Sequence, residues 1–182
     1  MLNGIDVAGL AAAREAIRSA PNEGAARYGV TLDWRGGTKL EARATGMSVG
    51  SEKIERGFKW TVDEPPQLLG DSAGPTPQEY LMSGVGACIL VGFVVNAAVK
   101  GVKINALSLS MDGGLDLAGF LNLRADAQVK MTGLDYTIEV DADADDEVLN
   151  EIARTALEFS PNAMTARHGV PVNGTLKIAA RA

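Results

Sequence analysis

The chemistry that this sequence offers centres on one thiol. Cys88 is the single cysteine of the chain, and Gly84 and Gly92 lie four residues before and after it. On a helix these positions share one face, so the thiol has no side chain one turn away on either side. Another element, the same helix of a second copy, or a ligand can therefore approach it closely. A thiolate here would be a nucleophile, whereas a buried thiol is usually a small hydrophobe, and both interpretations stay open.

Other reactive groups are sparse. His168 is the single histidine, and we expect it at the surface because a helix is predicted to end there. One Cys and one His leave only carboxylates to complete a transition-metal shell, so no metal and no other cofactor is expected. The acidic run DADADDE at 141–147 lacks the spacing and the central glycine of a calcium loop. It is interpreted as the solvated start of a helix.

A long helix over residues 74–101 is predicted to carry the cysteine. Thr76 and Glu79 form a capping box at its start, and Gly101 follows its end. No charge occurs between Glu79 and Lys100, so about 33 Å of helix is apolar nearly all round and must be surrounded. About twenty such residues could also cross a bilayer. The polar and glycine residues inside the run favour the core helix of a soluble fold, and no membrane partner is expected.

Strands with one solvated face are expected before this helix. Apolar and polar residues alternate over 28–35 and again over 39–44, and the Gly36-Gly37 pair between them predicts a hairpin. A third run, 58–63, alternates in the same way. A loop rich in Pro and Gly, DEPPQLLGDSAG, then leads to the helix. Trp34 and Trp60 are expected in the core or in an interface.

Three strands with one buried face are expected directly after the helix. Residues 102–111 alternate with a change of phase, which predicts a bulge. Residues 121–131 alternate without interruption, and a further strand is predicted over 134–140. Together these segments predict an antiparallel meander.

Two helices and a closing strand are expected at the end of the chain. The first helix follows the acidic run and breaks at Phe159. Ser160 can cap a short second helix that starts at Pro161. A closing strand is predicted over 170–178. Strands on both sides of one apolar helix predict an α+β sandwich.

Composition indicates one globular domain. The chain has 182 residues, of which 46% are hydrophobic and 22% charged. The net charge of -6 and the lack of a basic run argue against a nucleic-acid partner. A single cysteine excludes an internal disulfide, and without a signal-peptide pattern the cytoplasm is the expected compartment. A modest helix at 6–19, with Val7, Leu10, Ala11 and Ile17 as packing residues, makes 1–27 an N-terminal extension before a single domain at 28–182.

The segment that ends at the cysteine indicates a family. Residues 58–88, FKWTVDEPPQLLGDSAGPTPQEYLMSGVGAC, resemble the OsmC/Ohr family of osmotically inducible and organic-hydroperoxide-resistance proteins. The shared features are a strand, an Asp-Glu-Pro loop, a Gly-Pro-x-Pro helix start and a cysteine on the central helix. The order of elements fits the family over residues 28–180, and the chain differs from it by lacking the second cysteine.

The resemblance implies an OsmC-like fold in which antiparallel sheets wrap a long central buried helix. It implies an intertwined homodimer with an active site at the interface, where a peroxidatic cysteine attacks an organic hydroperoxide. Cys88 occupies that position, and its thiolate would become a sulfenic acid. The family's resolving cysteine lies in a Cys-Pro pair after the second long helix, and here that pair is Ser160-Pro161. A hydroxyl cannot form a disulfide, so Ser160 is interpreted as a helix cap.

Two other positions bear on the implied chemistry. The family's peroxidases place a glutamate ten residues before the cysteine to orient an arginine over the thiolate. Here that residue is Gln78, which can hydrogen-bond but carries no charge. Arg35 at the hairpin turn and Arg43 on the next strand are the candidates for the arginine, and no motif decides between them.

Two functions therefore stay open. The first is a one-cysteine hydroperoxide reductase in which an external thiol reduces the Cys88 sulfenic acid. The second is a non-catalytic protein of the same fold that binds a small apolar or acyl ligand at the dimer interface. Gln78 and Ser160 favour the second function, and a thiol between two glycines favours the first.

Overall fold

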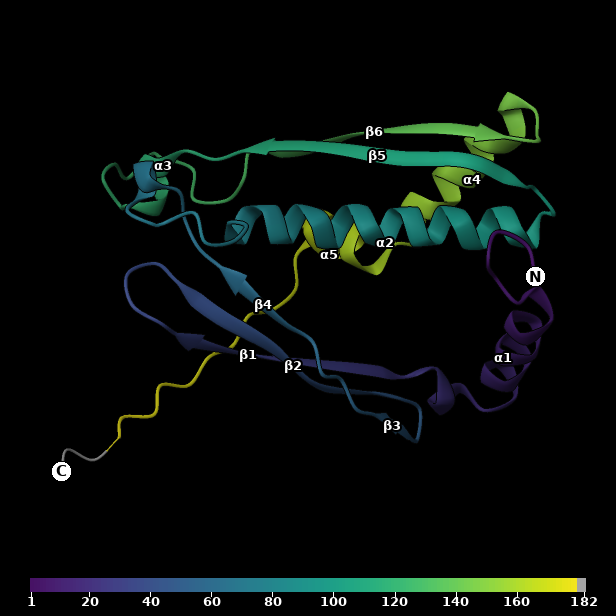
Figure 1. Cartoon of the computed structure of the whole chain (residues 1–182), viewed down its shortest axis with the longest axis horizontal. Helices are drawn as coiled ribbons and strands as arrows, with labels where there is room; N and C mark the ends of the chain where they lie inside the picture. Colours follow the sequence, from purple (N-terminus) through teal and green to yellow (C-terminus); the bar gives the residue numbers. More distant parts are fainter. Residues whose placement is uncertain (180–182) are drawn as a thin grey trace.

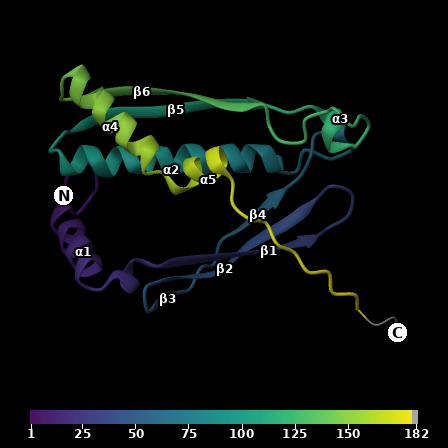
Figure 2. The same cartoon turned by 180° about the vertical axis from the view of Figure 1, so that it is seen from behind.

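The computed structural model describes residues 1–179, and its elements lie in layers around one long helix (Figure 1). The last three residues of the expected domain, 180–182, lie outside the described residues. In chain order the elements are α1 (Val7–Ser19), η1 (Pro21–Gly24), β1 (Ala26–Trp34), β2 (Leu40–Val49), β3 (Glu52–Ile54), β4 (Lys59–Val62), η2 (Pro66–Leu68), α2 (Pro77–Val99), β5 (Ile104–Gly114), α3 (Leu117–Phe120), β6 (Gly133–Ala142), α4 (Asp146–Glu158) and α5 (Pro161–His168). In both views α2 lies between the β5–β6 pair and the sheet of β1 to β4 (Figures 1 and 2). This arrangement confirms the predicted α+β class.

The first sheet contains the predicted hairpin. β1 and β2 pair antiparallel around a turn in which Gly36 and Gly37 adopt positive φ, a conformation that glycine reaches without strain. β4 pairs with the other side of β2, and a short β3 that the sequence pattern did not predict pairs with the end of β2.

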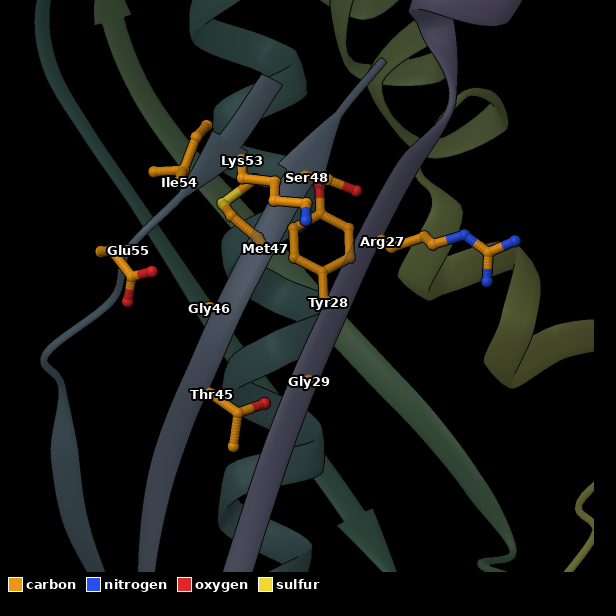
Figure 3. A pocket seen from close by; sticks show the side chains of 10 residues that line it. All are labelled: Arg27, Tyr28, Gly29, Thr45, Gly46, Met47, Ser48, Lys53, Ile54 and Glu55. Carbon is orange, nitrogen blue, oxygen red and sulfur yellow. The ribbon is translucent and has the colours of Figure 1, made fainter. Parts of the chain in front are cut away.

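A bulge near Gly46 keeps the apolar residues of β2 on one face. Val30 lies opposite Ala44, but Tyr28 lies opposite Met47, so β2 has one extra residue over this step. Gly46 takes φ +100° there. The extra residue rephases the strand, so Tyr28 and Met47 share a face while Arg27 points away from it (Figure 3).

The apolar face of the first sheet is largely exposed. The residues of β1 that form it are Tyr28, Val30, Leu32 and Trp34, each more than half exposed. Trp60 of β4 lies on the same face and contacts Tyr80 of α2, with ring centroids 6.4 Å apart. The apolar face is therefore the one directed towards α2. Trp34, expected in a core or an interface, is 71% exposed in the single chain.

The central helix begins and ends as predicted. The Thr76 backbone N–H donates to Glu79 Oε2 at 2.7 Å, and the Glu79 N–H donates to Thr76 Oγ1 at 3.2 Å, which completes the capping box. At the other end Gly101 has φ +76°, and the Val102 N–H returns to the Ala97 carbonyl at 2.9 Å. This is a Schellman ending.

One face of α2 forms the main core with the second sheet. Ile89 and Phe93 of α2 and Ile152 of α4 are almost completely buried, and apolar residues of β5 and β6 pack against them. The predicted bulge in β5 is present as a register shift between Ile104 and Ala106. Among the described helices only α2 is long and apolar enough to cross a membrane. In the single chain about a third of this apolar stretch is buried, where α2 packs against α4 and the second sheet.

The strand predicted over 121–131 is wrong. Gly114 pairs with Gly133, so β5 and β6 are direct neighbours and the segment between them is the loop that joins them. Its backbone donors bind local carbonyls instead of a partner strand, as in the bonds from Leu123 to Ala118 and from Ala127 to Arg124. Alternation indicates which residues would share a face, but a strand also needs backbone hydrogen bonds to a neighbouring strand, and here the donors are taken up locally.

The closing strand predicted over 170–178 is also not formed. These residues are exposed, and the segment runs away from the body of the chain (Figure 1). No described strand pairs with it. In the single chain its alternating residues therefore have no partner strand to hydrogen-bond with, and no other described element covers their apolar side.

The predicted helices are confirmed, with one difference in packing. α4 and α5 start and end where the sequence indicated, and α1 is the helix predicted for the N-terminal extension. We expected Val7, Leu10, Ala11 and Ile17 to pack down, but no residue of α1 is buried. This helix connects η1 and β1 to the opposite layer and covers no core (Figure 2).

The loop that leads into α2 is organised by the carboxylate of Asp63, which is 1% exposed. Oδ1 accepts from the Thr38 hydroxyl at 2.7 Å and from the Glu64 N–H at 2.9 Å, while Oδ2 accepts from the Asp71 and Ala73 N–H groups at 3.1 Å. The Thr38 hydroxyl, together with the backbone donors, lowers the pKa of Asp63 from 3.8 to about 2 despite burial. The carboxylate thereby joins the hairpin turn to the start of α2.

We expect Asp63 to make the free energy of unfolding depend on pH in the acid range. Its pKa is depressed in the folded state, so its ionised form stabilises the native chain above about pH 4, and this contribution is lost as pH falls towards 2. Asp63→Asn should lower the free energy of unfolding at neutral pH and should flatten its slope between pH 4 and 2, as measured by urea unfolding at each pH. Asp71→Asn is the control, because that side chain is 80% exposed. An unchanged slope in Asp63→Asn would contradict this assignment.

Candidate thiol site on the central helix

The face of α2 that carries Cys88 packs against α4 and α5. A Cβ added at Gly92 would lie 3.4 Å from the Ala156 Cα of α4, and one added at Gly84 would lie 3.7 Å from Asn162 Nδ2 of α5. Both distances are those of ordinary van der Waals contact, so α4 and α5 are the elements that pack on the two glycines in the single chain. Cys88 lies between the two contacts and is half-buried.

The junction of α4 and α5 lies opposite Cys88. α4 contacts α2 one turn after the cysteine and α5 contacts it one turn before, so the residues that join them cross the same stretch of α2. Ser160 is in this junction and is 2% exposed. Its hydroxyl accepts from the Ala163 N–H at 3.3 Å, so it caps α5 as predicted.

Asn162 fastens this junction to α2, and the sequence pattern did not identify it. Its Nδ2 donates to the Gly84 carbonyl at 2.8 Å. In an α-helix that carbonyl also accepts the N–H of the residue four positions later, which is Cys88. A single side chain therefore fixes α5 to the turn that precedes the thiol. A polar residue just inside a capped helix is a common surface pattern, so the sequence carried no signal for this role.

Beside the Cys88 face, α2 has an apolar stripe that the single chain leaves uncovered. Ser83, Ala87 and Val91 follow at intervals of four and are exposed, with Val91 63% exposed. Tyr80, two turns before Cys88, donates its hydroxyl to the Thr61 carbonyl at 2.6 Å and so joins this end of α2 to β4.

The residues expected to assist the thiol lie elsewhere in the single chain. Gln78 is in the first turn of α2, about 15 Å along the helix axis from Cys88. Arg43 pairs with Asp33 on the face of the first sheet that points away from α2. Arg35 pairs with Glu41 at 3.0 Å near the hairpin turn. Both arginines are therefore held by carboxylates of their own sheet, and their roles at the thiol stay predictions.

The remaining polar candidates form no metal site within the described residues. No group of three or more His, Cys, Asp and Glu side chains there is arranged to hold an ion. The side chain of Asn105 binds Asp141 and Asp143 of the acidic run. His168 ends α5 and is exposed, as expected.

An apolar hollow of about 610 Å³ lies between α2 and β5. Met82, Leu90, Leu109 and Met111 line it, and Glu79 lies at its edge. Gly86 and Leu90, which also line it, are two residues before and after Cys88 and thus about 200° round the helix. The hollow therefore lies mostly on the opposite side of α2 from the thiol, and it shares Ser83 and Ala87 with the exposed stripe.

The arrangement of elements matches known structures. An OsmC-like protein from Mycoplasma pneumoniae superposes with a TM-score of 0.61 at 18% identity, covering 78% of this chain and 88% of that one. A putative osmotic stress induced and detoxification response protein from Psychrobacter arcticus gives 0.58 at 14% identity, with coverages of 75% and 85%. An organic hydroperoxide resistance protein from Elizabethkingia anophelis gives 0.50 at 15% identity, with coverages of 78% and 89%. At these identities the likeness establishes the fold.

Sequence comparison adds the family. A search of curated proteins found no match. The sequence model of the family described as OsmC-like protein matches residues 70–174, which is more than half of the chain and includes α2, Cys88 and the α4–α5 junction. The chain therefore belongs to the OsmC-like protein family.

Proposed function

We propose that the chain is a thiol-dependent organic hydroperoxide reductase of one-cysteine type. The observation that carries the proposal is the half-buried Cys88 on the central helix of this family, between two glycines and opposite the α4–α5 junction, in which Ser160 is buried. Two of the structural relatives are described as a detoxification response protein and an organic hydroperoxide resistance protein. Their descriptions agree with this chemistry.

In the proposed reaction the Cys88 thiolate attacks one peroxide oxygen. The O–O bond breaks, an S–O bond forms, and the sulfur is oxidised by two electrons to a sulfenic acid. The alkoxide leaves and takes up a proton to become an alcohol. A first external thiol then displaces water from the sulfenic acid, and a second releases Cys88 as the external disulfide forms.

An external reductant is required because Ser160 occupies the place of a resolving thiol. Its hydroxyl cannot form a disulfide, and it already accepts the Ala163 N–H as a helix cap. A reducing compartment such as the cytoplasm would supply small thiols, and we place the protein there. Gln78 and Arg43 are proposed as assisting residues. Because Arg43 points away from α2 in the single chain, its contribution would depend on assembly.

The proposed assembly is a homodimer. The apolar face of the first sheet and the stripe of α2 beside Cys88 are both exposed in the single chain, and both contain large aliphatic residues such as Leu32 and Val91. Contiguous apolar surfaces of this kind mark interaction sites. A second copy would cover both, and the thiol would then lie beside the interface.

The apolar hollow between α2 and β5 supports a second candidate, the binding of a small apolar or acyl ligand without redox chemistry. Its volume of about 610 Å³ and its methionine and leucine lining suit such a ligand. In that case Cys88, on the opposite side of α2, would be a packing residue.

We expect Cys88 to react with a stoichiometric organic hydroperoxide within seconds to minutes. Intact-mass measurement with a sulfenic-acid trap should show one label per chain in the folded protein and none in Cys88→Ser. A thiol that stays unmodified when folded, yet reacts once unfolded, would exclude the reductase. Binding of fatty-acid probes to the same folded protein would then support the second candidate.

Ser160→Cys should convert the protein to a two-cysteine type. If the junction lies over Cys88, the introduced thiol should condense with the Cys88 sulfenic acid, releasing water and forming an intrachain disulfide. Non-reducing peptide mapping would detect it after one equivalent of hydroperoxide. Ser83→Cys is the control, because Ser83 lies on the exposed stripe of α2. Equal disulfide yields in the two variants would contradict the placement of the junction.

The dimer is tested on β1. Leu32→Gln should raise the dimer dissociation constant about tenfold or more, since a buried leucine contributes about 1.5–3 kcal/mol. Thr31→Gln lies on the other face of the same strand and should change it little. Analytical ultracentrifugation measures both. A monomeric parent protein, or equal effects of the two variants, would contradict this interface.

A further inference from the structure

The first 25 residues connect the two layers of the molecule. α1 runs from the start of β5 to the start of β1, and both views show it at the end of the molecule where α2 finishes (Figures 1 and 2). No residue of α1 is buried. Because α1 covers no core, burial does not explain its position. The contacts at its two ends do.

The upper end is fastened by the side chain of Asn3. Its Nδ2 donates to the Val102 carbonyl at 2.9 Å, and its Oδ1 accepts from the Ile104 N–H at 3.0 Å. Lys103, between these two, directs its carbonyl to Asp143 beside β6. Because successive groups of an extended strand point to opposite edges, Asn3 binds the free edge of β5 in the way that a neighbouring strand would.

The turn that carries Asn3 is itself well defined. The Leu2 and Ile5 backbones exchange hydrogen bonds of 2.9 and 2.8 Å. Asn3 adopts φ +52°, a left-handed conformation that asparagine tolerates better than most residues. Asp6 then caps α1 by accepting from the Gly9 N–H at 3.1 Å. The amide of Asn3 is therefore presented from a fixed turn directly joined to the helix.

The lower end is fastened to the first sheet. Oε2 of Glu23, in η1, accepts from the Ser51 N–H at 3.3 Å, and the Gly50 N–H donates to the Ala25 carbonyl at 2.7 Å. A Cβ at Gly50 would lie only 2.1 Å from the Glu23 carboxylate, so the two segments are in close contact. The connection thus holds the β2–β3 turn as well as β1.

At the opposite end of the molecule the layers meet a second time. Tyr80 of α2 bonds Thr61 of β4 at 2.6 Å, and the Asp63 N–H donates to the Pro75 carbonyl at 3.2 Å. The exposed apolar residues Val30 and Leu32 lie along β1 between the two connections. The first sheet is therefore tied to the rest of the chain at both of its ends.

We propose that the N-terminal extension is a strut that sets the distance between the first sheet and the layer of α2, β5 and β6, with the Asn3 side chain as the clasp that fastens it to β5. The 13 residues of α1 make a rigid spacer of about 20 Å. If the Asn3 hydrogen bonds to β5 were removed, the first sheet would pivot about the Tyr80 connection. The spacing of the two apolar faces would then no longer be defined. This inference does not depend on what covers those faces or on the reactivity of Cys88.

The test uses two spin labels on the Cys88→Ser chain, at Lys53→Cys in the first sheet and Lys103→Cys at the start of β5. Labelled chains are diluted into excess unlabelled chain so that pulsed electron resonance reports the distance within one chain. Asn3→Gly keeps the left-handed conformation and removes the amide. It should broaden the distance distribution at least twofold, and it should speed hydrogen exchange of the Ile104 amide at least tenfold.

Asn122→Gly is the matched control, because Asn122 also has positive φ, at +53°. It should leave both measurements unchanged. Faster exchange at Ile104 with an unchanged distance distribution in Asn3→Gly would show that the clasp does not hold the sheet, and would overturn the proposal. Unchanged exchange at Ile104 would overturn the clasp itself.

Discussion

The structure depends on the burial of a helix that carries no charge for about twenty residues. Such a surface must be removed from water, and β5, β6, α4 and α5 each cover part of α2. Ile89 and Phe93 are almost completely buried, and each such side chain contributes about 1.5–3 kcal/mol. The glycines at 84 and 92 also serve this packing. A side chain larger than alanine at 92 would push α4 away from α2. The surroundings of the thiol are thus a consequence of how the helix is packed.

The coverage of α2 is incomplete in one chain, and this limits what one chain can do. Its exposed stripe, beside the face that carries Cys88, and the apolar face of the first sheet are both left open. A hydroperoxide site requires a thiolate, a group that stabilises it and exclusion of bulk water. The single chain supplies the thiol and, on one side, the α4–α5 junction with its buried Ser160. A cationic group that stabilises the thiolate, and the remaining residues that exclude water, would have to come from assembly with a second copy.

Ser160 serves a structural task at the position where the family resemblance implies a second cysteine. A serine caps α5 well, because its oxygen accepts an N–H at the start of the helix. A thiol at that place would form a disulfide, whereas a hydroxyl stays protonated. The junction therefore keeps its geometry over α2, and in the proposed reaction the reduction of an oxidised Cys88 would fall to an external thiol. Asn162 holds that junction regardless of which chemistry occurs below it.

The sequence by itself determined the features that depend on neighbours along the chain. These are the capped central helix with Cys88, the first hairpin, the β5 bulge, the α4 and α5 helices and the Ser160 cap, because capping and periodicity act over a few residues. Only the tertiary structure decided that 121–131 and 170–178 are not strands, since a strand forms only where its backbone pairs with another strand, and neither segment pairs with one within the described residues. It alone revealed the roles of Asp63, Asn3 and Asn162. Each has a partner distant in sequence, namely Thr38 for Asp63, Val102 for Asn3 and Gly84 for Asn162. A polar side chain carries no local sign of such a partner.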